Sequence, residues 1–192
     1  MEQRFDVGRG VVVLERGDIT RQDTEAIANA ANSTLLGGGG VDGAIHRAAG
    51  PKLLQACRDA KRTLPSGLLP TGQAVLTPGF RLRAAHVIHC VGPVYAREGQ
   101  DAPRLLASCY ANALRLCREH DIRSIAFPSI STGVYGYPVQ EAAPIALAAV
   151  RDALEANDTP HLVKFSLFDD TTLEAYGAAA RDLFGGRAGR GS

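Results

Sequence analysis

A run of four glycines, Gly37–Gly40, stands just ahead of a carboxylate, Asp42, and is the strongest chemical signal in the sequence. The bare backbone N–H groups of such a run can approach a phosphate closely, and the N-terminus of a following helix adds positive potential. Asp42 at that helix start could orient a water molecule beside a bound phosphate. It could equally be a carboxylate favoured by the helix dipole, and the glycines a flexible surface loop. The pattern favours a phosphate site and leaves these alternatives open.

The glycines also satisfy the dinucleotide pattern G-x-G-x-x-G, at Gly38, Gly40 and Gly43. A nicotinamide-binding fold needs these glycines directly after a strand and an acidic residue at the end of a second strand. Here residues 32–37 intervene, and Asp59, at the required spacing, falls in helical sequence. No Gly-Lys-Ser/Thr follows, which excludes a Walker A loop. A dehydrogenase is therefore the least favoured hypothesis.

A second segment with chemical potential runs from Ser131 to Pro138, with the sequence STGVYGYP. It offers backbone N–H donors, hydroxyls and two tyrosines, which could form the wall and floor of a site for a flat or sugar-like ligand. The alternative is a Gly/Pro turn with tyrosines packed on the surface. Phe168 could lie in the core or stack on an adenine. Asn32 could be a turn residue, although two asparagines around Ala30-Ala31 suggest room for a polar ligand.

The elements that must position these residues alternate between strand and helix. Apolar, β-branched runs predict six strands, at 11–14, 26–30, 73–77, 86–91, 124–127 and 162–168. Helical patterns are expected from Thr20 to Glu25, at 43–61 with a break at Gly50-Pro51, at 103–120, at 141–157, and at 171–184 behind a Thr171/Glu174 capping box. This order predicts an α/β fold whose mixed sheet of about six strands is sandwiched between helices. The glycine loop and the other unusual segments all follow strands, so they should converge at the carboxyl edge of the sheet.

Composition narrows the class of protein. With 192 residues and 45% hydrophobic residues, the chain suits one globular domain at 1–184, followed by a flexible Gly/Arg tail at 185–192. A net charge of +1 without a basic stripe argues against duplex binding. No apolar run has membrane length, and no signal peptide is visible. The four cysteines lack CxxC spacing, so we expect reduced, buried thiols in a cytoplasmic protein. We also expect the protein to be a monomer. His86 and His89 should face opposite sides of a strand, and we expect no metal.

Several long motifs in this order resemble the MacroD branch of the macrodomain family, over about 11–184. They are GDIT at 17–20, NAAN at 29–32, GGGGVDGAIHRAAGP at 37–51, VIH and VGP at 87–93, and FP followed by ISTGVYGYP at 127–138. The resemblance implies a macrodomain fold and an ADP-ribose site. It implies that Asp18 accepts a hydrogen bond from the adenine amino group, assisted by the backbone at Ile19, and that Phe168 stacks on the adenine. The residues implied to contact the rest of the ligand are Asn29, Gly39, Gly40, Val41, Ser131, Thr132, Gly133, Val134 and Tyr135.

For catalysis, the resemblance implies that Asn32 contacts the distal ribose, that Asp42 positions the attacking water and that Tyr135 closes over that ribose. The implied activity is hydrolysis of ADP-ribosyl esters, namely O-acetyl-ADP-ribose and mono-ADP-ribosylated Asp or Glu of proteins, without cofactor or metal. Its partners would be ADP-ribose and ADP-ribosylated proteins. Two alternatives remain. The protein could be a non-catalytic ADP-ribose reader, or it could be a hydrolase of ADP-ribosylated nucleic acid, which the basic tail residues Arg187 and Arg190 weakly suggest.

Overall fold

Seven strands pair into one mixed sheet in the computed structural model, which describes residues 2–185. The strands are β1 (Gln3–Val7), β2 (Gly10–Arg16), β3 (Ala26–Ala31), β4 (Ala74–Pro78), β5 (His86–Val91), β6 (Ser124–Phe127) and β7 (Leu162–Leu167). Their order is β1-β2-β7-β6-β3-β5-β4. The five inner strands are parallel, and the edge strands β1 and β4 pair antiparallel with β2 and β5. Since the inner strands share one direction, their carboxyl ends meet at one edge.

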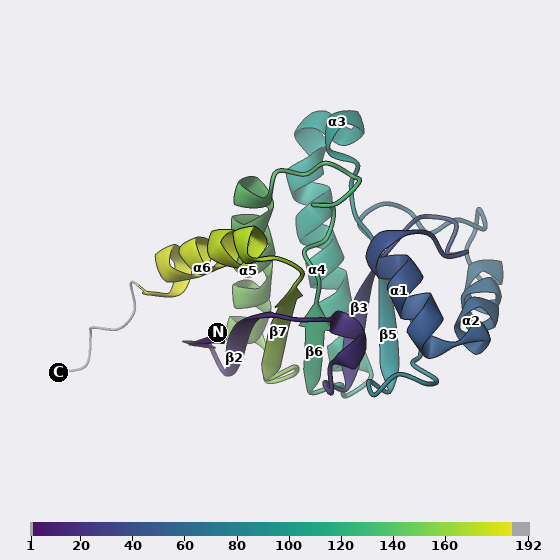
Figure 1. Cartoon of the computed structure of the whole chain (residues 1–192), viewed down its shortest axis with the longest axis horizontal. Helices are drawn as coiled ribbons and strands as arrows, with labels where there is room; N and C mark the ends of the chain where they lie inside the picture. Colours follow the sequence, from purple (N-terminus) through teal and green to yellow (C-terminus); the bar gives the residue numbers. More distant parts are fainter. Residues whose placement is uncertain (1, 186–192) are drawn as a thin grey trace.

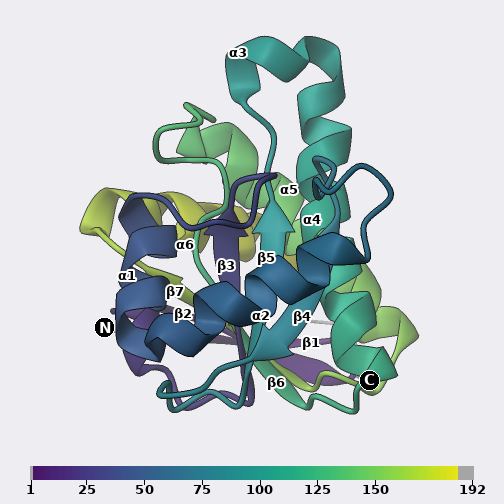
Figure 2. The same cartoon turned by 90° about the vertical axis from the view of Figure 1, so that its right-hand side faces the viewer.

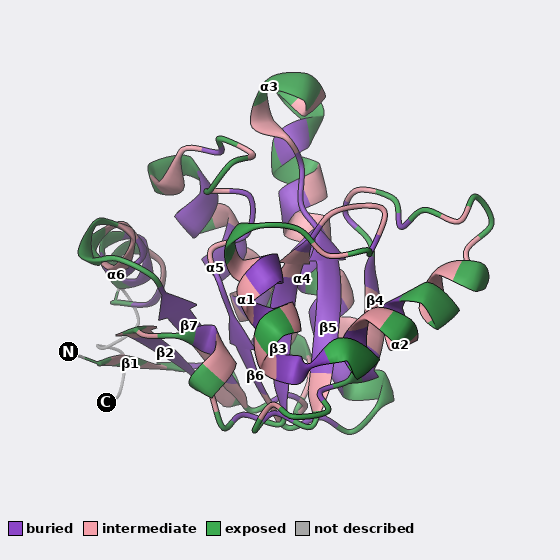
Figure 3. Ribbon diagram, turned by 45° about the vertical axis from the view of Figure 1, so that its right-hand side comes forward, coloured by how far each residue is buried: buried purple, intermediate pink, exposed green. Residues whose placement is uncertain are grey.

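Helices cover both faces of the sheet (Figures 1 and 2). They are η1 (Ile19–Arg21), α1 (Gly40–Ala49), α2 (Pro51–Arg62), α3 (Tyr95–Glu98), η2 (Gly99–Asp101), α4 (Ala102–Glu119), α5 (Val139–Ala156) and α6 (Asp170–Phe184). Buried Ile45 and Leu53 join α1 and α2 to one face, while Leu147 and Tyr176 belong to the larger core that α4, α5 and α6 form on the other. Burial is concentrated on the strands and the inner faces of the helices (Figure 3). The predicted α/β sandwich, a mixed sheet between two layers of helices, is confirmed.

The strand count differs from the prediction because the N-terminal segment adds β1. Its side chains alternate between partly buried and exposed, with charged Arg4 and Asp6 on the exposed side. An edge strand with one solvated face shows this alternation rather than an apolar run. Gly8, with φ of +57°, turns the chain back so that β1 pairs with β2. The strands predicted from apolar runs begin at 11–14, so this seventh strand was missed.

Two helix starts also differ from the prediction. Asp169, not Thr171, caps α6 by accepting a hydrogen bond from the Thr172 backbone N–H. After β2 the chain forms only the three-residue η1, which Asp18 caps through the backbone N–H of Thr20. Both aspartates stand where the extended backbone precedes the first turn, the position at which a short acceptor satisfies a free N–H.

Other predictions are confirmed. The helix break falls at Gly50, whose φ of +85° suits glycine. All four cysteines are buried free thiols. In β5, Ile88 and Cys90 face one core cluster and Val87 the other, so His86 and His89 point to opposite faces.

The helices, the possible metal ligands and the C-terminal tail were compared with the remaining predictions. Within residues 2–185, none of the helices has the length and apolar character to cross a membrane. In the same range, no group of three or more His, Cys, Asp or Glu side chains is placed to hold a metal ion. Gly185 caps α6, while the rest of the tail predicted to be flexible, 186–192, lies outside the described residues.

Candidate functional site

A cavity of about 380 Å³ opens at the carboxyl ends of β3, β5 and β6. Small-molecule sites are typically clefts of about 300–1,000 Å³, often at this edge of an α/β sheet. The structure therefore brings the glycine loop and the 131–138 loop together, as expected. The lining residues are Ala30, Ala31, Asn32, Gly38, Gly39, Gly40, Val41, Asp42, Gly92, Ser129, Ile130, Ser131, Gly133, Val134 and Tyr135.

The glycine run forms one wall of this cavity and then enters α1. A Cβ atom on Gly38 would lie 3.2 Å from Asp42 Oδ2 and 3.4 Å from Asn32 Nδ2, so a side chain there would crowd both polar groups. A Cβ on Gly39 or Gly40 would meet open space within 4 Å, and Gly40 has a φ of +56°. The main chain at these two residues is therefore bare beside the cavity and the N-terminus of α1, an arrangement suited to an anion.

Asp42 lies in the first turn of α1 and is only 5% exposed. Its Oδ1 accepts a 2.7 Å hydrogen bond from Asn29 Nδ2 and lies 3.4 Å from His46 Nε2. Its Oδ2 is the atom that approaches Gly38 in the cavity wall. Asp42 thus lines the cavity with one carboxylate oxygen anchored by Asn29, and its other oxygen lies beside Gly38, which also lines the cavity. A carboxylate held in this way can orient and deprotonate a water molecule without the entropic cost of ordering its own side chain.

Asn32 lines the cavity, and its side chain hydrogen-bonds to the segment that leads from β3 into the glycine run. Nδ2 donates to Gly37 O at 3.0 Å, and Oδ1 accepts from the backbone N–H and hydroxyl of Thr34. The side chain therefore fixes the path of the chain from the end of β3 to the glycine run. Asn29, by contrast, is fully buried beneath the cavity and is not part of its lining.

The loop after β6 forms the facing wall. Ser131 is 6% exposed, has a φ of +67°, and its buried Oγ has no hydrogen-bond partner within residues 2–185. Thr132 is not among the lining residues. Its hydroxyl donates to the backbone oxygen and to Oγ of Ser129. Val134 is fully exposed at the loop tip, and the Tyr95 backbone N–H donates to Tyr135 O. The first residue of α3 therefore tethers this loop, and Figure 2 shows α3 projecting above the same end of the sheet.

Asp18, Ile19 and Phe168 lie apart from the cavity lining, at the neighbouring ends of β2 and β7. These strands pair up to Arg16 and Leu167, and the Gly17 N–H donates to Leu167 O, so the residues that follow them are neighbours. Phe168 is 86% exposed, which rules out the core alternative.

Asp18 is prepared as a hydrogen-bond acceptor. Its Oδ1 accepts from the hydroxyl and backbone N–H of Thr20, which lower the pKa of the carboxyl below its ordinary value, and nearby Arg21 adds to this effect. Its Oδ2 has the Arg21 guanidinium at 3.7 Å. The carboxyl therefore stays ionised and presents Oδ2 at the surface, where it can accept a further hydrogen bond. Ile19, at 5% exposure, is anchored in the core.

Sequence reasoning did not single out Gly92, Ser129 and Ile130 as lining residues. A Cβ on Gly92 would clash with Ser131 Oγ, so this glycine allows the loop after β5 to approach the loop after β6 closely. The Gly92-Pro93 pair after a strand was a visible signal of a special turn. The contacts made by Ser129 and Ile130 depend on tertiary packing and had no such signal.

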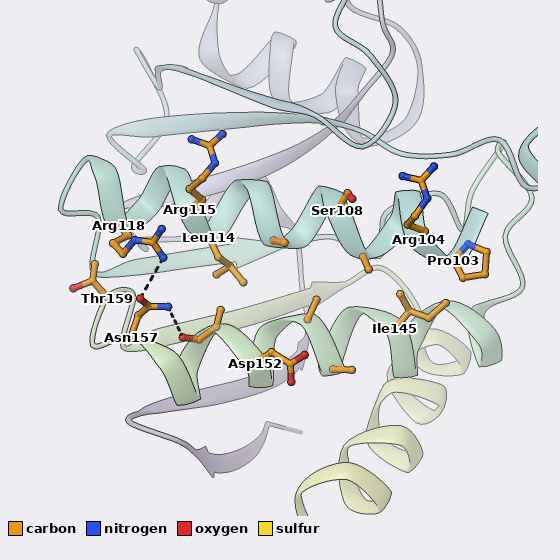
Figure 4. A pocket seen from close by; sticks show the side chains of 15 residues that line it. Pro103, Arg104, Ser108, Leu114, Arg115, Arg118, Ile145, Asp152, Asn157 and Thr159 are labelled. Carbon is orange, nitrogen blue, oxygen red and sulfur yellow. Dashed lines mark hydrogen bonds between the residues drawn. The ribbon is translucent and has the colours of Figure 1, made fainter. Parts of the chain in front are cut away.

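A larger groove of about 810 Å³ runs between α4 and α5 (Figure 4). Alanines of both helices are among its lining residues. Its arginines have partners nearby: Arg115 donates to Glu119 at 2.7 Å and Arg118 donates to Asn157 at 3.2 Å. It presents no convergent set of polar groups and lies along the helices rather than at the strand ends. The smaller cavity is therefore the candidate site.

Comparisons with known proteins agree with this architecture. A family model described as Macro domain matches residues 28–146. Macro domain-containing proteins of Chlorobaculum tepidum and Ralstonia nicotianae are 54% and 53% identical, over 84% and 87% of this chain and 90% and 92% of their own lengths. A solved Oceanobacillus iheyensis macrodomain with ADP superposes with a TM-score of 0.93 at 44% identity, covering 97% of this chain and 98% of that one. A Trypanosoma brucei macrodomain in complex with ADP-ribose gives 0.79 at 41% identity, covering 88% and 68%. The chain belongs to the macrodomain family.

Proposed function

We propose that this protein binds ADP-ribose across the 380 Å³ cavity and hydrolyses ADP-ribosyl esters there, as a MacroD-type member of its family. The substrates are O-acetyl-ADP-ribose and proteins mono-ADP-ribosylated on Asp or Glu. The observation that carries the proposal is the geometry of Asp42, a buried carboxylate in the cavity lining with one oxygen anchored by Asn29 and the other beside Gly38.

The two ends of the site suit the two ends of such a ligand. At the ends of β2 and β7, exposed Phe168 offers an aromatic face for adenine, and Asp18 Oδ2 accepts from its amino group, with the Ile19 backbone beside it. The bare main chain at Gly39 and Gly40 and the loop at 131–135 donate N–H groups to the diphosphate. This order leaves the distal ribose beside Asp42. Solved macrodomains with ADP and ADP-ribose, at 44% and 41% identity, support this assignment.

Hydrolysis then needs a positioned water and a good leaving group. Asp42 and a substrate phosphate oxygen hold the water next to the anomeric carbon, and Asp42 takes its proton as the bond to carbon forms. The carboxylate leaving group departs without strong acid help, so a second catalytic acid is not required. Proton transfer of this kind contributes about 10²–10⁴-fold to the rate.

The test compares Asp42→Ala with a remote carboxylate variant. Asp59→Ala is the matched control, since Asp59 lies on the surface of α2 in an ion pair with Arg62. We expect Asp42→Ala to lose about 10²–10⁴-fold in single-turnover hydrolysis of an ADP-ribosylated protein while calorimetry still registers ADP-ribose binding. Asp42→Asn, which keeps the volume, should behave alike. Full activity in both Asp42 variants would contradict the role of the carboxylate.

The same assay separates the alternatives. Binding without turnover in the wild type would make the protein an ADP-ribose reader. Turnover only with ADP-ribosylated DNA or RNA, in a panel that also holds ester-, serine- and arginine-linked substrates, would replace the protein ester as substrate.

A further inference from the structure

We propose that His89 of β5 is a positioning residue for Asp42: its Nδ1, as a hydrogen-bond acceptor, fixes the amide of Asn29 that anchors the carboxylate. This inference rests on the function proposed above and adds a residue that does not touch the cavity. His89 is fully buried and played no part in the expected site.

The residues form a continuous chain of contacts across the sheet. Asn29 and His89 are directly paired positions of the neighbouring parallel strands β3 and β5, which run side by side in Figure 2. Asn29 Nδ2 lies 2.7 Å from Asp42 Oδ1 and 3.1 Å from His89 Nδ1. His89 Nε2 in turn lies 2.9 Å from Thr77 Oγ1 and 3.7 Å from Cys57 Sγ.

The chemistry of these groups decides which atom carries each proton. An ionised carboxylate only accepts hydrogen bonds, so the Asn29 group facing Asp42 must be its NH₂. The second hydrogen of that NH₂ points to His89 Nδ1, which must therefore accept it. A neutral histidine with an acceptor at Nδ1 carries its proton on Nε2, where the Thr77 hydroxyl can accept it.

The surroundings keep His89 neutral. Burial lowers the pKa of His89 to about 3, and the nearby His46 ring, with centroids 6.4 Å apart, adds to the lowering. Burial also raises the pKa of the Cys57 thiol to about 12, so that neighbour stays uncharged. The two groups within hydrogen-bond distance of the ring nitrogens are Asn29 and Thr77, both neutral, and Asn29 stands between the ring and the Asp42 carboxylate. The acceptor at Nδ1 is therefore present at any pH at which the enzyme would work.

The orientation of Asn29 depends on these contacts because nothing holds its other end. Asn29 Oδ1 is buried and has no hydrogen-bond partner within residues 2–185. The two acceptors facing Nδ2, one from Asp42 and one from His89, are what distinguish the two flips of the amide. A flipped amide would press Oδ1 against Asp42 Oδ1, two acceptors in contact, and displace the carboxylate. His89 thus acts on the carboxylate through Asn29.

Two substitutions of His89 separate this role from general packing. In His89→Asn, the side-chain oxygen can take the place of Nδ1 and accept from Asn29, but the contact with Thr77 is lost. In His89→Gln, the amide reaches the position of Nε2 and Thr77, but Asn29 loses its acceptor. Both replace the same buried ring by a side-chain amide, and Asn, shorter by one methylene, leaves the larger cavity. Loss of packing alone would therefore make His89→Asn the worse variant, the opposite of the expected order. We expect hydrolysis by His89→Gln to fall about 10–100-fold in kcat, as for supporting partners of an active-site group, and His89→Asn to keep most of it. ADP-ribose affinity should be the same in both.

Equal losses of kcat in the two variants, or a loss in ADP-ribose affinity alone, would overturn the proposal. If either variant fails to fold, the role of His89 can still be tested on the wild-type protein. Nitrogen NMR of ¹⁵N-histidine-labelled protein should report His89 with its proton on Nε2 and no titration between pH 8 and 5. A proton on Nδ1 would refute the positioning role whatever the activity. An absence of turnover in the wild type would remove the proposed function instead, so the two failures are distinguishable.

Discussion

Replacing Gly43 by alanine sets two effects of known sign against each other. Gly43 is buried in α1, where alanine is favoured over glycine by about 1 kcal/mol. Its added Cβ, however, would lie 2.6 Å from the backbone oxygen of Gly38, closer than real Cβ atoms come to any atom. A backbone neighbour cannot rotate away, so the glycine loop itself must shift. Overpacking of this kind costs about 1–3 kcal/mol.

The clash therefore outweighs the helix preference, and we expect a net loss of about 0–2 kcal/mol in the free energy of unfolding. The displaced loop lines the cavity, so ADP-ribose affinity should fall about tenfold or more, which is about 1.4 kcal/mol. Urea unfolding and calorimetry measure the two quantities.

Gly177 supplies the matched control, since it too is a buried glycine inside a helix, α6. Its Cβ would meet the side-chain end of Gln3 at 2.8 Å, which can move aside. Gly177→Ala should keep wild-type affinity and gain up to about 1 kcal/mol of stability. Tight binding and raised stability in Gly43→Ala, or equal losses in both variants, would refute the reasoning.

Phe168, Tyr176 and Asp169 can each be tested by a single substitution. Phe168→Ala should leave the melting temperature unchanged, since the ring is 86% exposed, but weaken ADP-ribose binding by about 1–3 kcal/mol in calorimetry; unchanged affinity would remove the ring from the site. Tyr176→Phe deletes a hydroxyl bonded to Ser129 Oγ at 3.1 Å and near Tyr110 OH at 3.4 Å. Since Ser129 Oγ keeps its hydrogen bond from Thr132, the substitution should cost about 1 kcal/mol in urea unfolding, and an unaltered midpoint would contradict this. Hydrogen bonds from Thr172 lower the pKa of Asp169, so its cap stabilises the fold above the ordinary value of 3.8 and is lost as pH falls through the lowered pKa. Asp169→Ala should thus lower the melting temperature at pH 7 and differ little from wild type at the acid end, and a constant difference across pH would argue against the cap.

Much of the architecture was readable from local pattern. Strand-sized apolar runs, the helix break at Gly50 and the helix over 102–119 depend on residues close together in the chain, and all were predicted. The glycine run and the loop after β6 could be identified as candidate binding loops because such segments present bare backbone N–H groups and hydroxyls. Pattern reasoning failed at β1, because an edge strand with one solvated face lacks an apolar run, and at the cap of α6, because Asp169 and Thr171 are both residue types that cap helices.

Residue types and spacing were enough to predict the class of fold, the two loops that wall the cavity, and Asp42 and Asn32 as candidates. Three features needed the folded chain: Asn29 lies beneath the cavity as a partner of Asp42, His89 supports Asn29 from 60 residues along the chain, and Phe168 is exposed. The physical reason is that propensities, turns and glycine conformations are short-range properties of the backbone. A hydrogen bond between neighbouring strands exists only once the whole sheet has set their register.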